Sequence, residues 1–156
     1  MIDAFAGLWE DPAPSAPPAA PETGQFRFWV GKWALEWDGG TGRNVIRPIH
    51  GGRALLETFA ADPPEELRGN SVSAWDAPRG RWAQTWWDST GAILQLHGRF
   101  AGGVMELRTE PARDGAVHRM RFTAITPPSL DWEWARSAAA GGVFEPLWRI
   151  RYTRLG

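Results

Sequence analysis

The sequence contains no cysteine among its 156 residues, so disulfide scaffolds, thiolate zinc sites, iron–sulfur clusters and cysteine nucleophiles are excluded. It also lacks an excess of charge, because 17 basic residues meet 18 acidic ones and leave a net charge of -1. A dedicated binder of nucleic acid or of anionic membranes uses a large positive field, so we expect neither partner. No apolar run approaches the roughly 18 residues that a membrane-spanning helix needs.

Signals for export, metal binding and cofactor binding are also missing. Asp3 stands where a secretory signal peptide carries basic residues, so we expect a cytoplasmic protein. The three histidines, His50, His97 and His118, lack the paired spacing of a zinc site, and no position singles out a haem ligand. The chain also has no G-x-S-x-G elbow. We therefore expect no metal and no cofactor, with haem binding kept only as an alternative.

Tryptophan, in contrast, is abundant, since 11 Trp accompany 7 Phe and a single Tyr. The length and the 43% hydrophobic content suffice for one ordinary globular core. We expect residues 1–25 to form an arm, in which a short helix with Phe5 and Trp9 on one face precedes a proline-rich stretch. Residues 26–156 are then expected to form a single domain.

Turn signals divide this domain at nearly even intervals of about 12 residues. They are glycine, proline or Asp-Gly clusters at residues 39–40, 51–52, 63–64, 78–80, 91, 102–103, 114–115, 127–128 and 141–142. These nine turns separate ten segments that are too short to contain crossover helices, which disfavours parallel topologies. The spacing predicts antiparallel strands joined by hairpins.

The segments alternate between apolar and polar residues, as half-buried strands do. Trp33, Leu35 and Trp37 share one face, for example, and Lys32 and Glu36 share the other. Consecutive antiparallel strands with one apolar face can split into a sandwich or close into an up-and-down barrel, and closure removes exposed edges. The even hairpin spacing favours an all-β, up-and-down barrel of about ten strands.

Four segments carry a more specific pattern: residues 28–33 (FWVGKW), 51–57 (GGRALLE), 80–91 (GRWAQTWWDSTG) and 152–154 (YTR). They resemble an uncharacterised bacterial family of lipocalin-like β-barrel proteins, whose pattern reads F-x-x-G-x-W, then G-x-W-x-Q-x-W-x-D-S-x-G, then Y-x-R. The resemblance covers about residues 26–156 and implies a calycin-type barrel, without implying a ligand or an activity. One position departs from the pattern, because Trp132 stands where the family often has a polar residue such as Gln.

The central motif places Trp82, Gln84, Trp86 and Asp88 on one face of a predicted strand. An amide and a carboxylate between two indoles are costly to bury unless they are hydrogen-bonded, and such groups orient ligands in apolar pockets. As an alternative, Gln84 bonds a neighbouring strand and Asp88 accepts backbone N–H bonds from the turn that follows it. Trp86 and Trp87 face opposite ways, so one of them lies outside.

Glu57 lies between Leu55 and Phe59 on one face of its segment, so its carboxyl has apolar neighbours if that face points inward. Desolvation there would raise its pKa and suit a general acid or base. The alternative is a salt bridge with an arginine. We favour the salt bridge over catalysis and keep Glu57 as a ligand contact.

Further aromatic side chains are predicted to line the interior. They are Trp33, Trp37, Trp132, Trp134 and Tyr152, with Trp148 at the end of the barrel that we expect to be filled. The alternative is a solid core, because small barrels are usually packed with side chains. A ten-stranded barrel has more interior space, and indole N–H groups need partners, which favours a ligand-sized cavity.

We therefore expect a binder of a small hydrophobic, planar ligand that Gln84, Asp88 or Glu57 orients. The alternative from another class is an isomerase or cyclase that uses Glu57 and Asp88 as acid and base in a dry cavity. A filled structural barrel is a third hypothesis. These hypotheses share one fold, which does not decide among them, and the sequence leaves a homodimer open.

Overall fold

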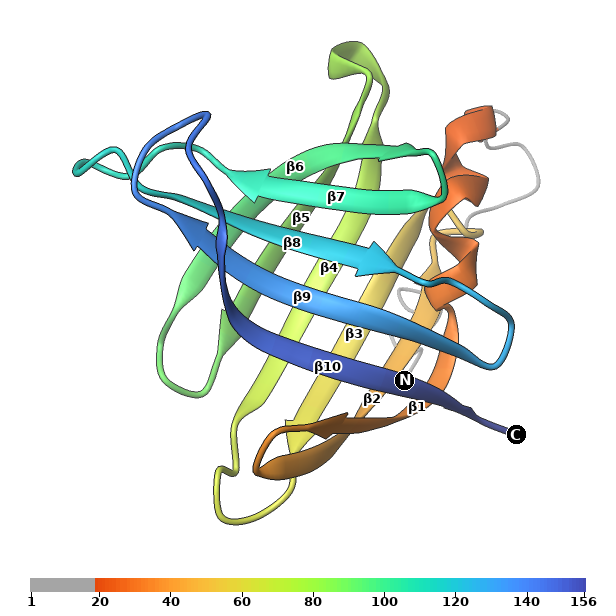
Figure 1. The fold of residues 1–156 in the computed structure, drawn as a ribbon. Coiled ribbons are helices and arrows are strands. Elements are labelled where there is room, and N and C mark those ends of the chain that lie inside the picture. The colour runs from red at the N-terminus through yellow and green to blue at the C-terminus, as the bar shows by residue number, and fades with distance from the viewer. Residues whose placement is uncertain (1–18) are drawn as a thin grey trace, which may run out of the picture.

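The computed structural model of the protein describes residues 19–156 (Figure 1). The helix predicted around Phe5 and Trp9 lies outside these residues. The described chain begins with a 3₁₀ helix, η1 (Pro21–Trp29), and continues with ten strands and a short 3₁₀ helix, η2 (Ala77–Arg79). The strands are β1 (Gly31–Trp37), β2 (Gly40–Ile49), β3 (Ala54–Ala61), β4 (Arg68–Asp76), β5 (Arg81–Asp88), β6 (Ile93–Ala101), β7 (Val104–Thr109), β8 (Val117–Thr123), β9 (Ser129–Ser137) and β10 (Glu145–Leu155).

The ten strands form one closed antiparallel barrel, in which each strand pairs with its neighbour in the chain and β1 pairs with β10. All nine predicted turns fall in the connections between consecutive strands. The prediction of an all-β, up-and-down barrel is therefore confirmed. Closure satisfies the backbone groups that an open sheet would expose at its edges. No helix among residues 19–156 is long and apolar enough to cross a membrane.

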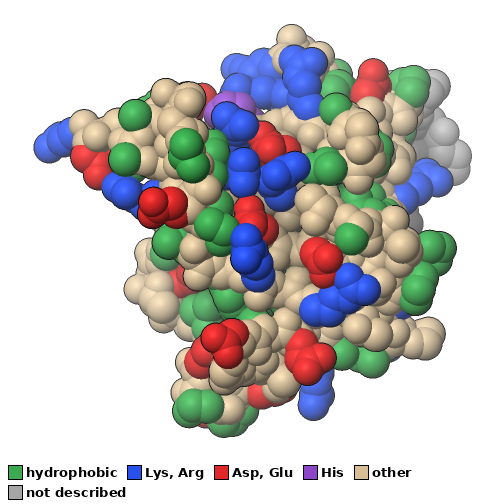
Figure 2. Space-filling view, in the orientation of Figure 1, with side chains coloured by type: hydrophobic (Ala, Val, Ile, Leu, Met, Phe, Trp, Pro, Cys, Tyr) green, Lys and Arg blue, Asp and Glu red, His purple; other side chains and the backbone are tan. Residues whose placement is uncertain are grey.

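Side chains alternate between the interior and the outer surface along each strand, as the sequence predicts. On β5, Trp82 is buried and Trp86 lines the interior, whereas Trp87 is 43% exposed on the outer face. Arginines on the outer face form ion pairs, such as Arg151 with Asp131 at 2.7 Å. Basic and acidic side chains are interspersed over the centre of the visible face of the molecule (Figure 2).

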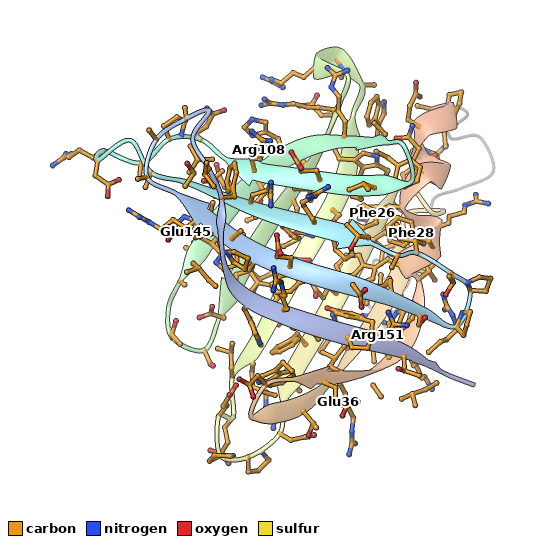
Figure 3. All side chains as sticks on the ribbon, viewed as in Figure 1. Phe26, Phe28, Glu36, Arg108, Glu145 and Arg151 are labelled. Atoms are coloured by element: carbon orange, nitrogen blue, oxygen red, sulfur yellow. The ribbon has the colours of Figure 1, made fainter. Side chains whose placement is uncertain are left out.

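The helix η1 closes one end of the barrel. Phe26 and Trp29 are fully buried there, and their rings stack with centroids 5.0 Å apart. Phe26 also meets Trp82 and Phe122 edge-on, each at 5.2 Å. Figure 3 labels Phe26 and Phe28, two residues of η1, at this end. The arm boundary that we predicted at residue 25 falls within η1, because the second half of this helix packs into the barrel.

Arg154 fastens the same end. Its guanidinium lies 4.1 Å from the centre of the Trp33 ring and donates hydrogen bonds to three backbone oxygens. These acceptors are the carbonyls of Phe28 at 2.9 Å, Val30 at 2.6 Å and Pro127 at 2.7 Å. One side chain thus links β10, the end of η1 and the β8–β9 loop.

Candidate functional site

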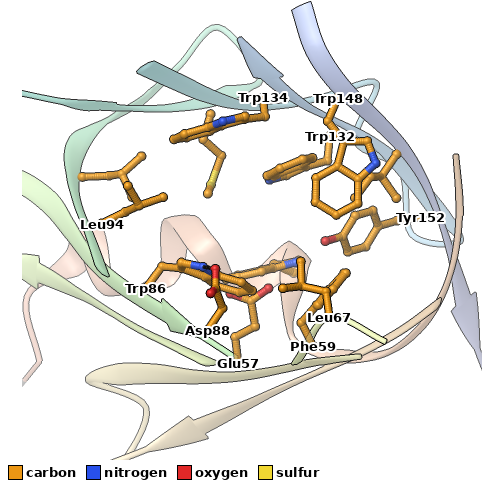
Figure 4. Close-up of a pocket in the computed structure, with 14 residues that line it drawn as sticks. Glu57, Phe59, Leu67, Trp86, Asp88, Leu94, Trp132, Trp134, Trp148 and Tyr152 are labelled. Atoms are coloured by element: carbon orange, nitrogen blue, oxygen red, sulfur yellow. Dashed lines mark hydrogen bonds between the residues drawn. The ribbon is translucent and has the colours of Figure 1, made fainter. Parts of the chain in front are cut away.

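A cavity of about 170 Å³ occupies the other half of the barrel (Figure 4). It is lined by Trp29, Glu57, Phe59, Leu67, Trp86, Asp88, Leu94, Leu96, Met120, Trp132, Trp134, Trp148, Ile150 and Tyr152. Leu67 and Asp88 stand where strands meet their loops, so they mark the mouth, and Trp29 of η1 marks the floor. An engineered cavity of roughly 150 Å³ in another protein holds benzene, so this cavity has room for about one aromatic ring.

Indole rings form the walls of the cavity. Figure 4 shows Trp134 and Trp132 on one side and Trp86 on the other, with the open space between them. Trp148 meets Trp132 edge-on with centroids 5.6 Å apart, and Phe59 meets Trp86 at 5.9 Å. The four indoles are only half-buried although they point inward, because each faces the cavity. Walls of this kind suit a flat apolar molecule.

The position of Trp86 is set by two neighbours. Gly69 on β4 pairs with Asp88 on β5, and a Cβ atom on Gly69 would collide with the six-membered ring of Trp86. The indole therefore lies directly against the glycine backbone. On its other edge, Trp86 Nε1 donates a hydrogen bond to Asp88 Oδ2 at 2.9 Å. The glycine and the carboxylate together hold the ring as one wall of the cavity.

Asp88 is both a turn residue and a cavity residue. Its Oδ1 accepts hydrogen bonds from Thr90 N at 2.8 Å, Thr90 Oγ1 at 2.5 Å and Ala92 N at 3.4 Å. Burial alone would raise the pKa of Asp88, but the hydrogen bonds from Thr90, Trp86 and Ala92 outweigh it and lower that pKa. The turn contacts that we considered as an alternative are present, and the ionised carboxylate also lines the mouth.

Glu57 is the buried carboxyl at the floor. Its Oε1 accepts a hydrogen bond from Asn44 Nδ2 at 2.7 Å, and its Oε2 accepts one from Ser71 Oγ at 2.5 Å. Burial raises the pKa of Glu57 to about 7, although the hydrogen bonds from Ser71 and Asn44 oppose this rise. The salt bridge that we favoured is wrong, since no arginine within residues 19–156 pairs with Glu57. The carboxyl faces inward, whereas the ion-paired arginines lie outside.

Tyr152 lies beside this carboxyl, and Asn44 connects the two. Asn44 Nδ2 also donates to the Tyr152 hydroxyl at 3.1 Å. Burial, and then the charge of Glu57, raise the pKa of Tyr152 above its ordinary value, so the phenol stays protonated at neutral pH. Trp29 Nε1 lies beside the same hydroxyl without reaching hydrogen-bond geometry, and it has no other described partner. The floor therefore presents a carboxyl, a phenol and an indole N–H.

Sequence reasoning missed Asn44, and the strand alternation could have found it. Gly42, Asn44 and Ile46 share the inward face of β2, and Asn44 is fully buried. The same alternation on β6 turns Leu94 and Leu96 inward, where both line the cavity. These residues lacked an aromatic or charged side chain to draw attention to them.

Four predicted ligand contacts do not line the cavity. Trp33 and Trp82 are buried at the closed end, where Trp33 Nε1 donates to Trp29 O and Trp82 Nε1 to Gln25 Oε1. Gln84 Nε2 donates to Ser73 Oγ on β4 at 2.9 Å, so the alternative of a bond to a neighbouring strand is the one observed. The fourth, Trp37, lies at the mouth of the barrel.

Trp37 and Trp148 pack together at the mouth, with ring centroids 5.2 Å apart. Trp37 Nε1 donates to Glu65 Oε1 at 3.3 Å, and this indole stands behind the cavity wall instead of forming it. Trp148 does line the cavity, so our placement of it at the filled end is wrong. The reason is the chain direction: β10 enters the barrel from the mouth and reaches η1 only near Arg154.

Within the described residues, no group of three or more His, Cys, Asp or Glu side chains is placed to hold a metal ion. His118 stacks on Trp134 with centroids 5.1 Å apart and does not line the cavity.

No protein-family model and no curated protein matches the sequence. The class of the protein is therefore defined by its fold: a closed, ten-stranded antiparallel barrel, compatible with a lipocalin-like fold.

Proposed function

We propose that the protein binds a small, flat, predominantly apolar molecule in the barrel, as a lipocalin-like protein of the family that its motifs resemble. The observation that carries this proposal is the cavity itself, with indole walls, the Glu57 carboxyl at its floor and the Asp88 carboxylate at its mouth. Apolar walls with a few fixed polar groups are typical of small-molecule sites.

The unfilled interior favours binding over a filled structural barrel. Side chains normally fill the interior of a small barrel, because unfilled space forfeits dispersion contacts. Here Trp86, Trp132 and Trp134 leave space between them. A ligand would supply the missing contacts.

An acid–base enzyme remains the second candidate, because one observation favours it specifically. The pKa of Glu57, raised by burial to about 7, lets this carboxyl gain or lose a proton at neutral pH. Tyr152 lies beside it as a protonated phenol. An isomerase or cyclase acting on a hydrophobic molecule would use such a pair for proton transfer in a site that excludes water.

Binding is tested by calorimetric titration with 2-phenylethanol, a neutral aromatic probe with one hydroxyl. We expect saturable binding to the parent protein and its loss in Leu94→Trp, because the new indole would fill the cavity. Ile93→Trp is the matched control, since Ile93 is adjacent in β6 but 70% exposed on the outer face. Absence of binding to the parent, or equal binding by both variants, would reject the cavity as the site.

The two candidate functions are separated by Glu57→Gln. This change removes proton transfer from the buried carboxyl and keeps similar shape and hydrogen bonding. A binder should retain most of its affinity for a molecule that copurifies from the native host, which native mass spectrometry would detect. An acid–base enzyme should lose on the order of 10²-fold or more in turnover of that molecule.

A further inference from the structure

The cavity carries carboxyl groups and no basic group. Of its described lining residues, Glu57 and Asp88 are the acids, and no lysine, arginine or histidine lines it. The ion-paired arginines lie on the outer face, and Arg154 is engaged at the closed end. An anionic ligand would meet only like charge and would lack a counterion, so the electrostatics of the cavity disfavour it.

The indole walls of the cavity also favour a cation over an anion. The face of an indole carries partial negative charge and is the best aromatic acceptor for a cation. Trp86 and Trp134 lie on opposite sides of the open space (Figure 4). Asp88 Oδ2 accepts the N–H of Trp86 at 2.9 Å, which places an ionised oxygen at the edge of that ring. A cation over Trp86 therefore meets an aromatic face and a carboxylate together.

Resting on the proposed binding function, we infer that the ligand is an organic cation: a small flat apolar body held between Trp86 and Trp134, with a protonated nitrogen directed at Asp88. A neutral ligand would remove part of the water around the Asp88 carboxylate and would offer no opposite charge in its place. A protonated amine replaces the lost water with a charge-assisted hydrogen bond to this carboxylate.

The cation belongs at the mouth and not at the floor. Glu57 is faced by Asn44 from β2, Ser71 from β4 and Tyr152 from β10, and none of these groups is charged. Each oxygen of Glu57 already accepts a hydrogen bond, and burial favours its neutral form. Asp88 Oδ2 accepts only the Trp86 N–H among its described contacts, so it has capacity for a second donor.

The test compares three probes of nearly equal size by calorimetry at low salt: 2-phenylethylamine, 2-phenylethanol and phenylacetate. We expect the protonated amine to bind on the order of 10-fold more tightly than the alcohol. Phenylacetate should bind most weakly. Equal affinities for amine and alcohol, or a preference for the alcohol, would overturn the inference while leaving the proposed function intact. If no probe binds, the proposed function itself fails.

Asp88→Asn should remove the preference for the amine, measured as the ratio of amine to alcohol affinity in the same variant. Asp62→Asn is the control, because Asp62 follows β3 at the same mouth, bonds Thr41 and does not line the cavity. It changes the net charge equally and should keep the preference. If Asp88→Asn does not fold, Trp134→Leu gives a second measurement, since loss of one indole face should also reduce the preference. An unchanged preference in these cavity variants would refute the inference.

Discussion

Asn44 on β2 donates a hydrogen bond to Glu57 on β3 at 2.7 Å, although the two residues are not cross-strand partners. In the register of these strands, Asn44 faces Phe59 and Glu57 faces Ile46. The contact is therefore diagonal, and the same amide also reaches Tyr152 on β10. This arrangement holds the carboxyl within an uncharged, buried environment, from which a pH dependence of stability follows.

The first prediction concerns Glu57 and pH. Because burial raises its pKa from 4.5 to about 7, the folded protein keeps a proton that the unfolded chain releases between these values. The raised pKa of Glu57 contributes its full amount to the free energy of unfolding below a pH of about 4.5. This contribution is lost as the pH rises through about 7. Between pH 5 and 8, the parent should lose on the order of 2–3 kcal/mol from this group, and Glu57→Gln should not.

Urea unfolding of both proteins at pH 5 and pH 8 measures this difference. Other groups, such as His118, whose pKa is lowered mainly by burial, contribute equally to both proteins and cancel. Parallel pH dependences in parent and variant would mean that Glu57 ionises normally in the folded state.

A second prediction compares two tryptophans on the inward face of β5. Trp82 is fully buried between η1 and Trp75, so Trp82→Ala should cost about 3–5 kcal/mol of unfolding free energy. Trp86→Ala should cost less, because one face of that indole meets the cavity and has fewer packing contacts to lose. Chemical denaturation of the two variants is the measurement. Equal losses of unfolding free energy in the two variants, together with no binding of the aromatic probe to the parent, would indicate a filled barrel.

A third prediction concerns Arg154 at the closed end. Arg154→Lys should cost on the order of 2–4 kcal/mol, since an ammonium cannot make the three carbonyl contacts and stack on Trp33 at the same time. Arg151→Lys is the control on the same strand, because its ion pair with Asp131 is exposed and should contribute about 1 kcal/mol or less. Similar midpoints in thermal unfolding of the two variants would contradict this role.

The fourth prediction concerns Gly69. A methyl group there collides with the Trp86 ring, so Gly69→Ala should push the indole into the cavity. We expect a stability cost of roughly 1–3 kcal/mol and weaker binding of 2-phenylethanol. Gly24→Ala is the control, because a Cβ atom on Gly24 meets nothing within 4 Å. Near-ultraviolet circular dichroism would report the movement of the indole, and an unchanged spectrum with unchanged affinity would exclude it.

Local sequence patterns predict the strands, their turns and which side chains of each strand share a face. These features are local: hairpin turns need particular residues at particular positions, and side chains in a strand alternate with a period of two. Alternation placed Trp86 and Asp88 on one face of their strand, and it placed Glu57 between two apolar residues on one face of its own strand. The closed order of the strands followed as well, because ten hairpin-linked strands without long connections have few other arrangements.

The height of each inward residue along the barrel axis, in contrast, depends on how the strands assemble. Trp82 and Trp86 share one face of β5, yet one packs against η1 and the other lines the cavity. Alternation cannot separate them, because height depends on the strand stagger and on the end that η1 enters. The diagonal bond from Asn44 to Glu57 depends on the same stagger. The site therefore arises from the closure of the barrel, which brings together residues far apart in the chain.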